Sequence, residues 1–152
     1  MLIVRKMILI AGLVVFALTS TVTTAVAGSV SQGQMLKAVN ALRQQHRLPL
    51  LKLHPSLQKA ADEQARLMAK KRKMSHKVGW GHGFRARLKR AGYRGLAAEN
   101  IALGQETLGQ VLSAWMNSRG HRRNMLHPRM RFFGLAANRG GGRKFWAMVL
   151  GG

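Results

Sequence analysis

The hydrophobic pattern of this chain changes at Pro128, and that change limits which folds the chain can adopt. Before Pro128, apolar residues recur every three or four positions, which is the spacing of one helix face. This spacing predicts helices over residues 35–46, 55–73, 84–91 and 108–117. After Pro128, two apolar runs suit β-strands, residues 132–137 and 144–150, and the glycine-rich segment between them is typical of a hairpin loop longer than two residues.

Helices first and strands last indicate an α+β fold with an antiparallel sheet. Residues 97–103 form one more apolar run, which we interpret as a buried connection or the start of a strand. The large aromatic side chains of these segments are expected in the core. They are Trp115, Phe132, Phe133, Phe145 and Trp146.

The first 27 residues have the three parts of a secretory signal peptide. Arg5 and Lys6 give a positive start, residues 7–18 are an apolar run too short to span a bilayer comfortably, and Ala25-Val-Ala27 has the A-x-A cleavage pattern. An uncleaved membrane anchor is the alternative. The sequence therefore predicts a signal peptide over residues 1–27, a flexible start over 28–34 and one domain over 35–152. We expect an exported protein, periplasmic or extracellular, without a transmembrane span after cleavage.

The chain has no cysteine, so an exported form must fold without disulfides. Disulfides are common in exported eukaryotic domains and optional in bacterial ones, which indicates a bacterial protein. A thiol nucleophile and a cysteine zinc site are excluded. The chain also lacks the H-E-x-x-H, G-x-S-x-G and G-x-x-x-x-G-K-[ST] patterns of zinc proteases, serine hydrolases and phosphate loops.

The charge balance is strongly basic, with 26 Lys and Arg against four acidic residues and a formal net charge of +22. Such a surface attracts anionic envelope components such as phospholipid, lipopolysaccharide or a cell-wall polymer. The basic residues are dispersed over many segments and no RNA-binding aromatic signature is present, which disfavours nucleic acid.

Glu99 is the acidic residue whose position most needs a partner. It lies within the apolar run 97–103, where a buried carboxylate is costly unless it is paired. His76 and His121 flank it in turns that contain Ser or Gly. Two imidazoles and a carboxylate can hold Zn²⁺ with an open position for water, or can form a hydrogen-bonded network without metal. The residue pattern leaves both open.

At these residues the chain resembles the CAP superfamily, named after cysteine-rich secretory proteins, antigen 5 and pathogenesis-related 1, whose domain is also called the SCP domain. The similarity is closest to its short, cysteine-free bacterial branch and runs from about Met35 to Leu150. The segments that carry it are Asn40-x-x-Arg43, Met74-Ser-His76, Ala98-Glu-Asn-Ile101, Trp115-Met-Asn-Ser-x-Gly-His-Arg-x-Asn-Met-Leu126 and Phe132-Phe-Gly-Leu-Ala136. The resemblance implies a three-layer α-β-α sandwich with a central antiparallel sheet and a surface cleft.

Family members carry two His and two Glu in that cleft, and in some of them this set binds a divalent metal. His76 matches the first His, Glu99 the first Glu and His121 the second His, whereas Ser118 stands where the second Glu would be. Loss of that carboxylate weakens a Ca²⁺ site, but His-His-Glu still suits Zn²⁺. The resemblance thus implies a cleft of His76, Glu99, His121, Ser118 and Asn124, with His76, His121 and Glu99 as candidate ligands for Zn²⁺ or another divalent metal.

The family has no single agreed activity, so three functions remain open. We favour a binding module whose polar cleft recognises an envelope or extracellular ligand, with or without a metal. The second is a metal-assisted, protease-like hydrolase with Glu99 as ligand or candidate general base. The third is a protein that binds polyanions or a membrane surface through charge. A purely structural role for His76, Glu99 and His121, pinning loops together, is the alternative to all three, and enzymatic activity stays undecided.

Overall fold

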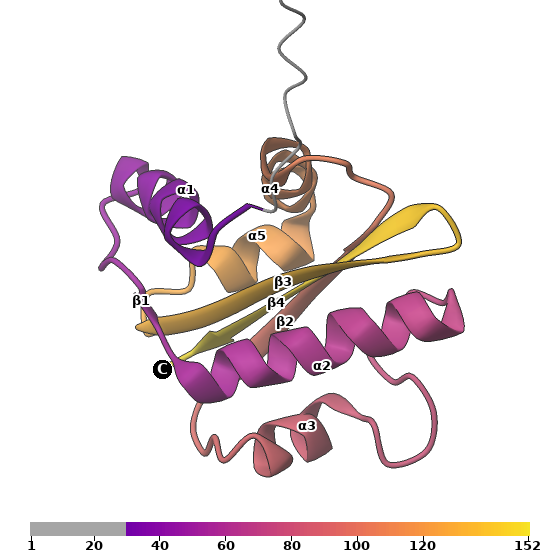
Figure 1. Cartoon of the computed structure of the whole chain (residues 1–152). Coiled ribbons are helices and arrows are strands. Elements are labelled where there is room, and N and C mark those ends of the chain that lie inside the picture. The colour runs from indigo at the N-terminus through magenta and orange to yellow at the C-terminus, as the bar shows by residue number, and fades with distance from the viewer. Residues whose placement is uncertain (1–29) are drawn as a thin grey trace, which may run out of the picture.

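The computed structural model describes residues 30–152, so the predicted signal peptide over 1–27 lies outside the described residues. Five helices and four strands follow one another along this part of the chain (Figure 1). In order they are α1 (Gln32–Gln45), β1 (Lys52–Leu53), α2 (Pro55–Lys71), α3 (Phe84–Arg90), β2 (Ala97–Leu103), α4 (Leu108–Asn117), α5 (Arg119–Met125), β3 (Phe132–Gly140) and β4 (Arg143–Gly151).

The strands form one sheet in the order β1-β3-β4-β2, which makes β2 an edge strand. The β2–β4 and β3–β4 pairs are antiparallel, and β1 joins β3 in parallel through two residues. Helices α1, α4 and α5 cover one face of the sheet and α2 and α3 cover the other (Figure 1). The predicted α+β, three-layer α-β-α architecture is confirmed, with the short parallel β1 added to the antiparallel sheet.

Each face of the sheet has its own core because successive strand residues point to opposite sides. On β2, Ala102 packs with Val111 and Trp115 of α4, whereas its neighbour Ile101 packs on the other side with Ala61 of α2. The predicted core aromatics are buried, apart from Phe132, which is half-buried. Two hydrophobic cores, one on each face of the sheet, thus stabilise a fold that has no disulfides.

Polar side chains tie the layers together where backbone groups would otherwise lack partners. The Asn40 amide donates to the Leu51 carbonyl at 2.9 Å and accepts the Leu51 N–H at 2.8 Å. The buried Arg43 guanidinium donates to the carbonyls of Pro49 and of Met125, the last residue of α5. Burial, with a smaller effect of the Arg131 charge, lowers the pKa of Arg43. These contacts give the Asn40-x-x-Arg43 pattern a structural role in fastening α1 to β1 and α5.

Three local expectations are corrected. Helix α1 begins at Gln32, because Ser31 and Gln34 form a capping box, so residues 32–34 of the predicted flexible start are helical. His121 lies within helix α5 rather than in the turn that the sequence predicts for it. The β3–β4 hairpin has a two-residue turn, because Gly141 and Gly142 adopt the positive φ of 57° and 77° that such a tight turn favours.

Candidate functional site

The free edge of β2 is where the sequence-predicted site residues meet. Glu99 points with Ile101 toward the α2–α3 layer, while Asn100 points with Ala102 toward the α4–α5 layer. Two side chains of the α4–α5 layer donate to carbonyls of this strand. Trp115 Nε1 donates to Ile101 at 3.1 Å, and Asn124 Nδ2 lies 3.5 Å from the carbonyl of Glu99.

Glu99 is buried, as the sequence predicts, and its carboxylate has two partners. One oxygen accepts from a terminal nitrogen of Arg87, and the other lies 2.8 Å from Nδ1 of His76. The Arg87 side chain is fully buried, whereas that of His76 is 57 % exposed. A buried carboxylate is thus balanced by a buried guanidinium, with the imidazole of His76 bound to its outer side.

Arg87 is the site residue that sequence reasoning missed. Besides Glu99, its guanidinium donates to the carbonyl of His76 at 3.0 Å and to that of His82. Its Nε is buried without a partner. A signal was available, because Arg87 follows Phe84 by three positions and precedes the buried Leu88, which places it on the inward face of α3.

His121 lies on the α5 side of the edge strand and does not join the Glu99 carboxylate. Its carbonyl accepts from Asn100 Nδ2 at 3.1 Å, and its ring centroid is 6.5 Å from that of Trp115. Burial, with a smaller effect from the charge of His76, lowers the pKa of His121 below the ordinary histidine value. A neutral imidazole is therefore favoured at neutral pH.

Ser118 and Asn124 form hydrogen bonds with neighbouring backbone groups and with Asn100, and neither contacts the Glu99 carboxylate. Ser118 directly precedes α5. Its backbone N–H donates to the carbonyl of Trp115, and its carbonyl accepts from the backbone N–H of Arg122. The Asn124 amide donates to Asn100 Oδ1 at 2.9 Å. Both residues shape the α4–α5 corner that carries His121.

The contacts of Glu99 do not leave room for a metal ligand set. Among residues 30–152, no group of three His, Asp or Glu side chains could hold a metal ion. Both carboxylate oxygens of Glu99 are already bonded, and the buried positive charge of Arg87 opposes a second cation. In this arrangement the described residues do not form a metal ligand set, so Zn²⁺ binding and the general-base role of Glu99 stay predictions.

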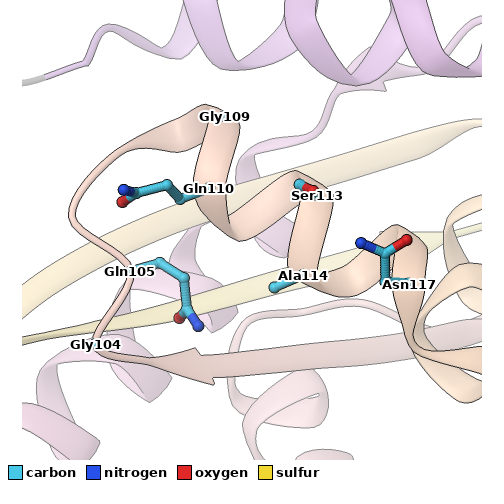
Figure 2. A pocket seen from close by; sticks show the side chains of 7 residues that line it. All are labelled: Gly104, Gln105, Gly109, Gln110, Ser113, Ala114 and Asn117. Atoms are coloured by element: carbon cyan, nitrogen blue, oxygen red, sulfur yellow. The ribbon is translucent and has the colours of Figure 1, made fainter.

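A hollow in the surface follows the outer side of α4. It has a volume of about 630 Å³ and is lined by Gly104, Gln105, Gly109, Gln110, Ser113, Ala114 and Asn117. We call these seven residues the α4 groove. Figure 2 shows Gly104 and Gln105 at one end of it and Asn117 at the other, with the side chains of Gln105, Gln110, Ser113 and Asn117 along its length. Asn117 directly precedes Ser118, so the groove ends at the α4–α5 corner.

The seven residues of the groove carry no charge on a chain of net charge +22, although the guanidinium of Arg143 lies beside Gly104. Ser113 and Asn117 can each donate and accept hydrogen bonds, whereas Gln110 Oε1 already accepts from the N–H groups of Glu106 and Thr107. Gln105 Oε1 is buried without a hydrogen-bond partner, although the carbonyl of the same residue accepts from Trp146 Nε1 at 2.7 Å. Of these residues the sequence points only to Asn117, as a polar group beside the cleft, because small and amide side chains on a helix surface carry no distinctive pattern.

The three-layer sandwich with a polar edge at β2 defines a CAP-type domain. Residues 36–150 match the family model described as the Cysteine-rich secretory protein family, and the chain belongs to this CAP family. It has 36 % identity over 118 residues to the uncharacterized protein YkwD of Bacillus subtilis (strain 168), covering 74 % of this chain and 45 % of that protein.

Solved structures of bacterial proteins share the fold. An extracellular protein containing an SCP domain from Bacillus anthracis superposes with a TM-score of 0.69 at 28 % identity, covering 78 % of this chain and 39 % of that one. An outer surface protein from Borrelia burgdorferi gives a TM-score of 0.69 at 23 % identity, covering 77 % and 88 %. The chain thus spans less than half of the Bacillus proteins and most of the Borrelia protein. Among residues 30–152, no helix is long and apolar enough to cross a membrane.

Proposed function

We propose that this protein is an exported binding module that recognises an uncharged, hydroxyl-rich segment of a bacterial envelope glycan. The observation that carries the proposal is the α4 groove, a shallow and open depression of about 630 Å³ whose seven lining residues carry no charge, on a strongly basic chain. Sugar hydroxyls both donate and accept hydrogen bonds, as do the amide and hydroxyl side chains of the groove. The sequence-predicted residues His76, Glu99 and His121 lie at or beside the edge strand β2 and are not among the residues that line the groove.

Binding is favoured over hydrolysis by the contacts of Glu99. A general base must be within hydrogen-bond reach of the proton that it removes. Both oxygens of Glu99 instead accept from Arg87 and His76, which suits a structural or binding role. Export is supported by the predicted signal peptide and by the relatives described as extracellular or outer-surface proteins.

Titration with soluble glycans, followed by amide NMR shifts and calorimetry, tests the proposal. The probes are an uncharged chitooligosaccharide and a soluble peptidoglycan glycan fragment. We expect saturable binding with shifts in residues 104–117, and an Asn117→Ala variant about fivefold weaker, because one hydrogen bond contributes about 1 kcal/mol. Gln44→Ala, which removes an exposed amide from α1, is the matched control and should bind like the wild type.

Two results would count against the groove. If neither glycan binds saturably, the glycan assignment fails. If shifts gather at residues 76, 99 and 121 and Asn117→Ala binds normally, recognition belongs to the predicted His/Glu cleft instead. Cleavage of the glycan during the titration would favour the hydrolase function over the binding module.

A further inference from the structure

The side chain of Trp80 is exposed to solvent, whereas the other two tryptophans of the chain are buried. Trp80 is 95 % exposed, whereas Trp115 and Trp146 are each 1 % exposed. A tryptophan presents about 150–250 Å² of largely apolar surface, which proteins normally cover. Met74, in the same connection between α2 and α3, is 48 % exposed. We call residues 72–83 the α2–α3 loop; Figure 1 shows it swinging out from the end of α2 before it returns to α3.

Glycines with a left-handed backbone conformation lie on both sides of Trp80. Gly79 and Gly81 have φ values of 89° and 73°, which side chains with a Cβ rarely adopt. A Cβ at Gly81 would meet nothing within 4 Å, and one at Gly79 would make only ordinary contact with His82. The glycines are therefore needed for the conformation that displays Trp80 and not for close packing.

The base of the loop is held by buried groups. The carbonyl of Ser75 accepts from Gln64 Nε2 at 2.5 Å, and Arg87 donates to the carbonyls of His76 and His82. Val78 is buried between these points. The Arg87–Glu99–His76 contacts thus also fix the loop that carries Trp80. A side chain displayed on a fixed loop loses little further entropy when it binds.

The segment that contains the loop is rich in positive charge, and the two acids that contact the loop, Glu63 at His82 and Glu99 at His76, are largely buried. Residues 70–85 contain six exposed cations, namely Lys70, Lys71, Arg72, Lys73, Lys77 and Arg85, and no acid. None of the five ion pairs within residues 30–152 uses these cations.

The acid nearest to this segment along the chain, Glu63, has its own partners. Burial raises the pKa of Glu63, but hydrogen bonds from Arg90 and His82 outweigh this and leave it below its ordinary value. Arg90 also donates to the carbonyl of Gly81 at 2.9 Å. Glu63 is therefore ionised and balances Arg90, not the six cations.

We propose that the α2–α3 loop docks the protein on an anionic lipid surface, with Trp80 entering the headgroup region and the surrounding cations facing lipid phosphates. Tryptophan prefers the membrane interface, where its ring is half-desolvated and its N–H stays hydrated. Basic side chains next to an anionic bilayer add attraction that salt weakens. The surface lies outside the α4 groove, so this docking is independent of the proposed glycan binding.

Intrinsic fluorescence with lipid vesicles tests this docking, because Trp80 is the exposed fluorophore. The predicted signal peptide is omitted, so the protein is prepared without residues 1–27. With vesicles of phosphatidylcholine mixed with phosphatidylglycerol, we expect a blue shift and loss of acrylamide quenching. With phosphatidylcholine alone, or at high salt, neither should occur. Trp80→Ala should lower vesicle partitioning several-fold, whereas Leu50→Ala, which truncates another exposed apolar residue, should not.

A charge-matched pair of variants separates local docking from net charge. Lys71→Gln, Lys73→Gln and Lys77→Gln together remove three charges from the end of α2 and from the loop, and we expect about a hundredfold loss of partitioning. Arg119→Gln, Arg122→Gln and Arg123→Gln remove three exposed charges from α5 and should have a much smaller effect. Equal losses in both triple variants, or an unchanged Trp80 spectrum with anionic vesicles, would refute the proposal. A blue shift with soluble glycan but not with vesicles would make Trp80 a sugar-stacking residue instead.

Discussion

The guanidinium of Arg87 forms an ion pair with the carboxylate of Glu99, and both side chains are buried at the edge of the sheet. The same guanidinium donates to two carbonyls of the α2–α3 loop. Glu99 therefore binds the loop through Arg87 as well as through His76. This network fits the structural alternative raised by the sequence, in which the polar cluster pins loops together, and it makes the site rigid before any ligand arrives.

Replacing Glu99 by Gln should destabilise the protein by about 3 kcal/mol or more, because Arg87 would keep a buried charge without a counter-charge. Urea unfolding of the wild type and Glu99→Gln measures the difference. The matched control is Glu106→Gln, whose ion pair with Arg139 is about half exposed and should contribute at most about 1 kcal/mol. If both variants lose the same small amount, the buried pair does not hold the loop.

The pH dependence of stability should report the neutral state of His121. Its folded-state pKa lies below the unfolded value of about 6.5, so its contribution is fully present above that value and is lost as pH falls through the folded pKa. Unfolding free energies between about pH 8 and pH 5 should fall with acidification, less steeply for His121→Gln than for the wild type. His46→Gln removes an exposed histidine and should keep the wild-type slope. An unchanged slope in His121→Gln would exclude this contribution.

The parts of the fold that the sequence could predict are those with a local cause. Apolar spacing located α2 and α4 within a few residues, and the apolar runs after Pro128 predicted the hairpin. Helix α5 was missed as a full helix because it contains Gly120 and has no apolar stripe of its own. It is held by partners distant in sequence, such as Arg43, which donates to its last carbonyl.

The candidate site shows the same limit. Glu99 could be singled out because a carboxylate inside an apolar run needs a partner, and His76 is that partner in part. Arg87 could not be paired with Glu99 from spacing, because only the packing of α3 against the sheet brings the two together. The α4 groove could not be predicted for another reason. Its lining residues come from α4 and from the segment that joins β2 to α4, and only the path of that segment brings them around one depression.

Truncating Asn40 to Ala should destabilise the protein by about 2 kcal/mol, because the N–H and carbonyl of the buried Leu51 would both lose their partner. Hydrogen exchange gives a local readout, and the Leu51 amide should lose protection in the variant. Asn117→Ala removes an exposed amide and should leave stability within about 0.5 kcal/mol of the wild type. Retained protection at Leu51 would show that β1 is held by its pairing with β3 alone.

Two glycine-to-alanine changes should act in opposite directions. A Cβ at Gly140 would collide with the backbone of Ala69 in α2, so Gly140→Ala should destabilise by about 3 kcal/mol by forcing α2 away from the hairpin. A Cβ at Gly120 would meet nothing within 4 Å, and Gly120→Ala should stabilise α5 by about 0.5–1 kcal/mol because alanine loses less backbone entropy. Thermal unfolding of both variants measures the signs. A stabilising Gly140→Ala would mean that α2 and the β3–β4 hairpin are not in the close contact on which this packing argument depends.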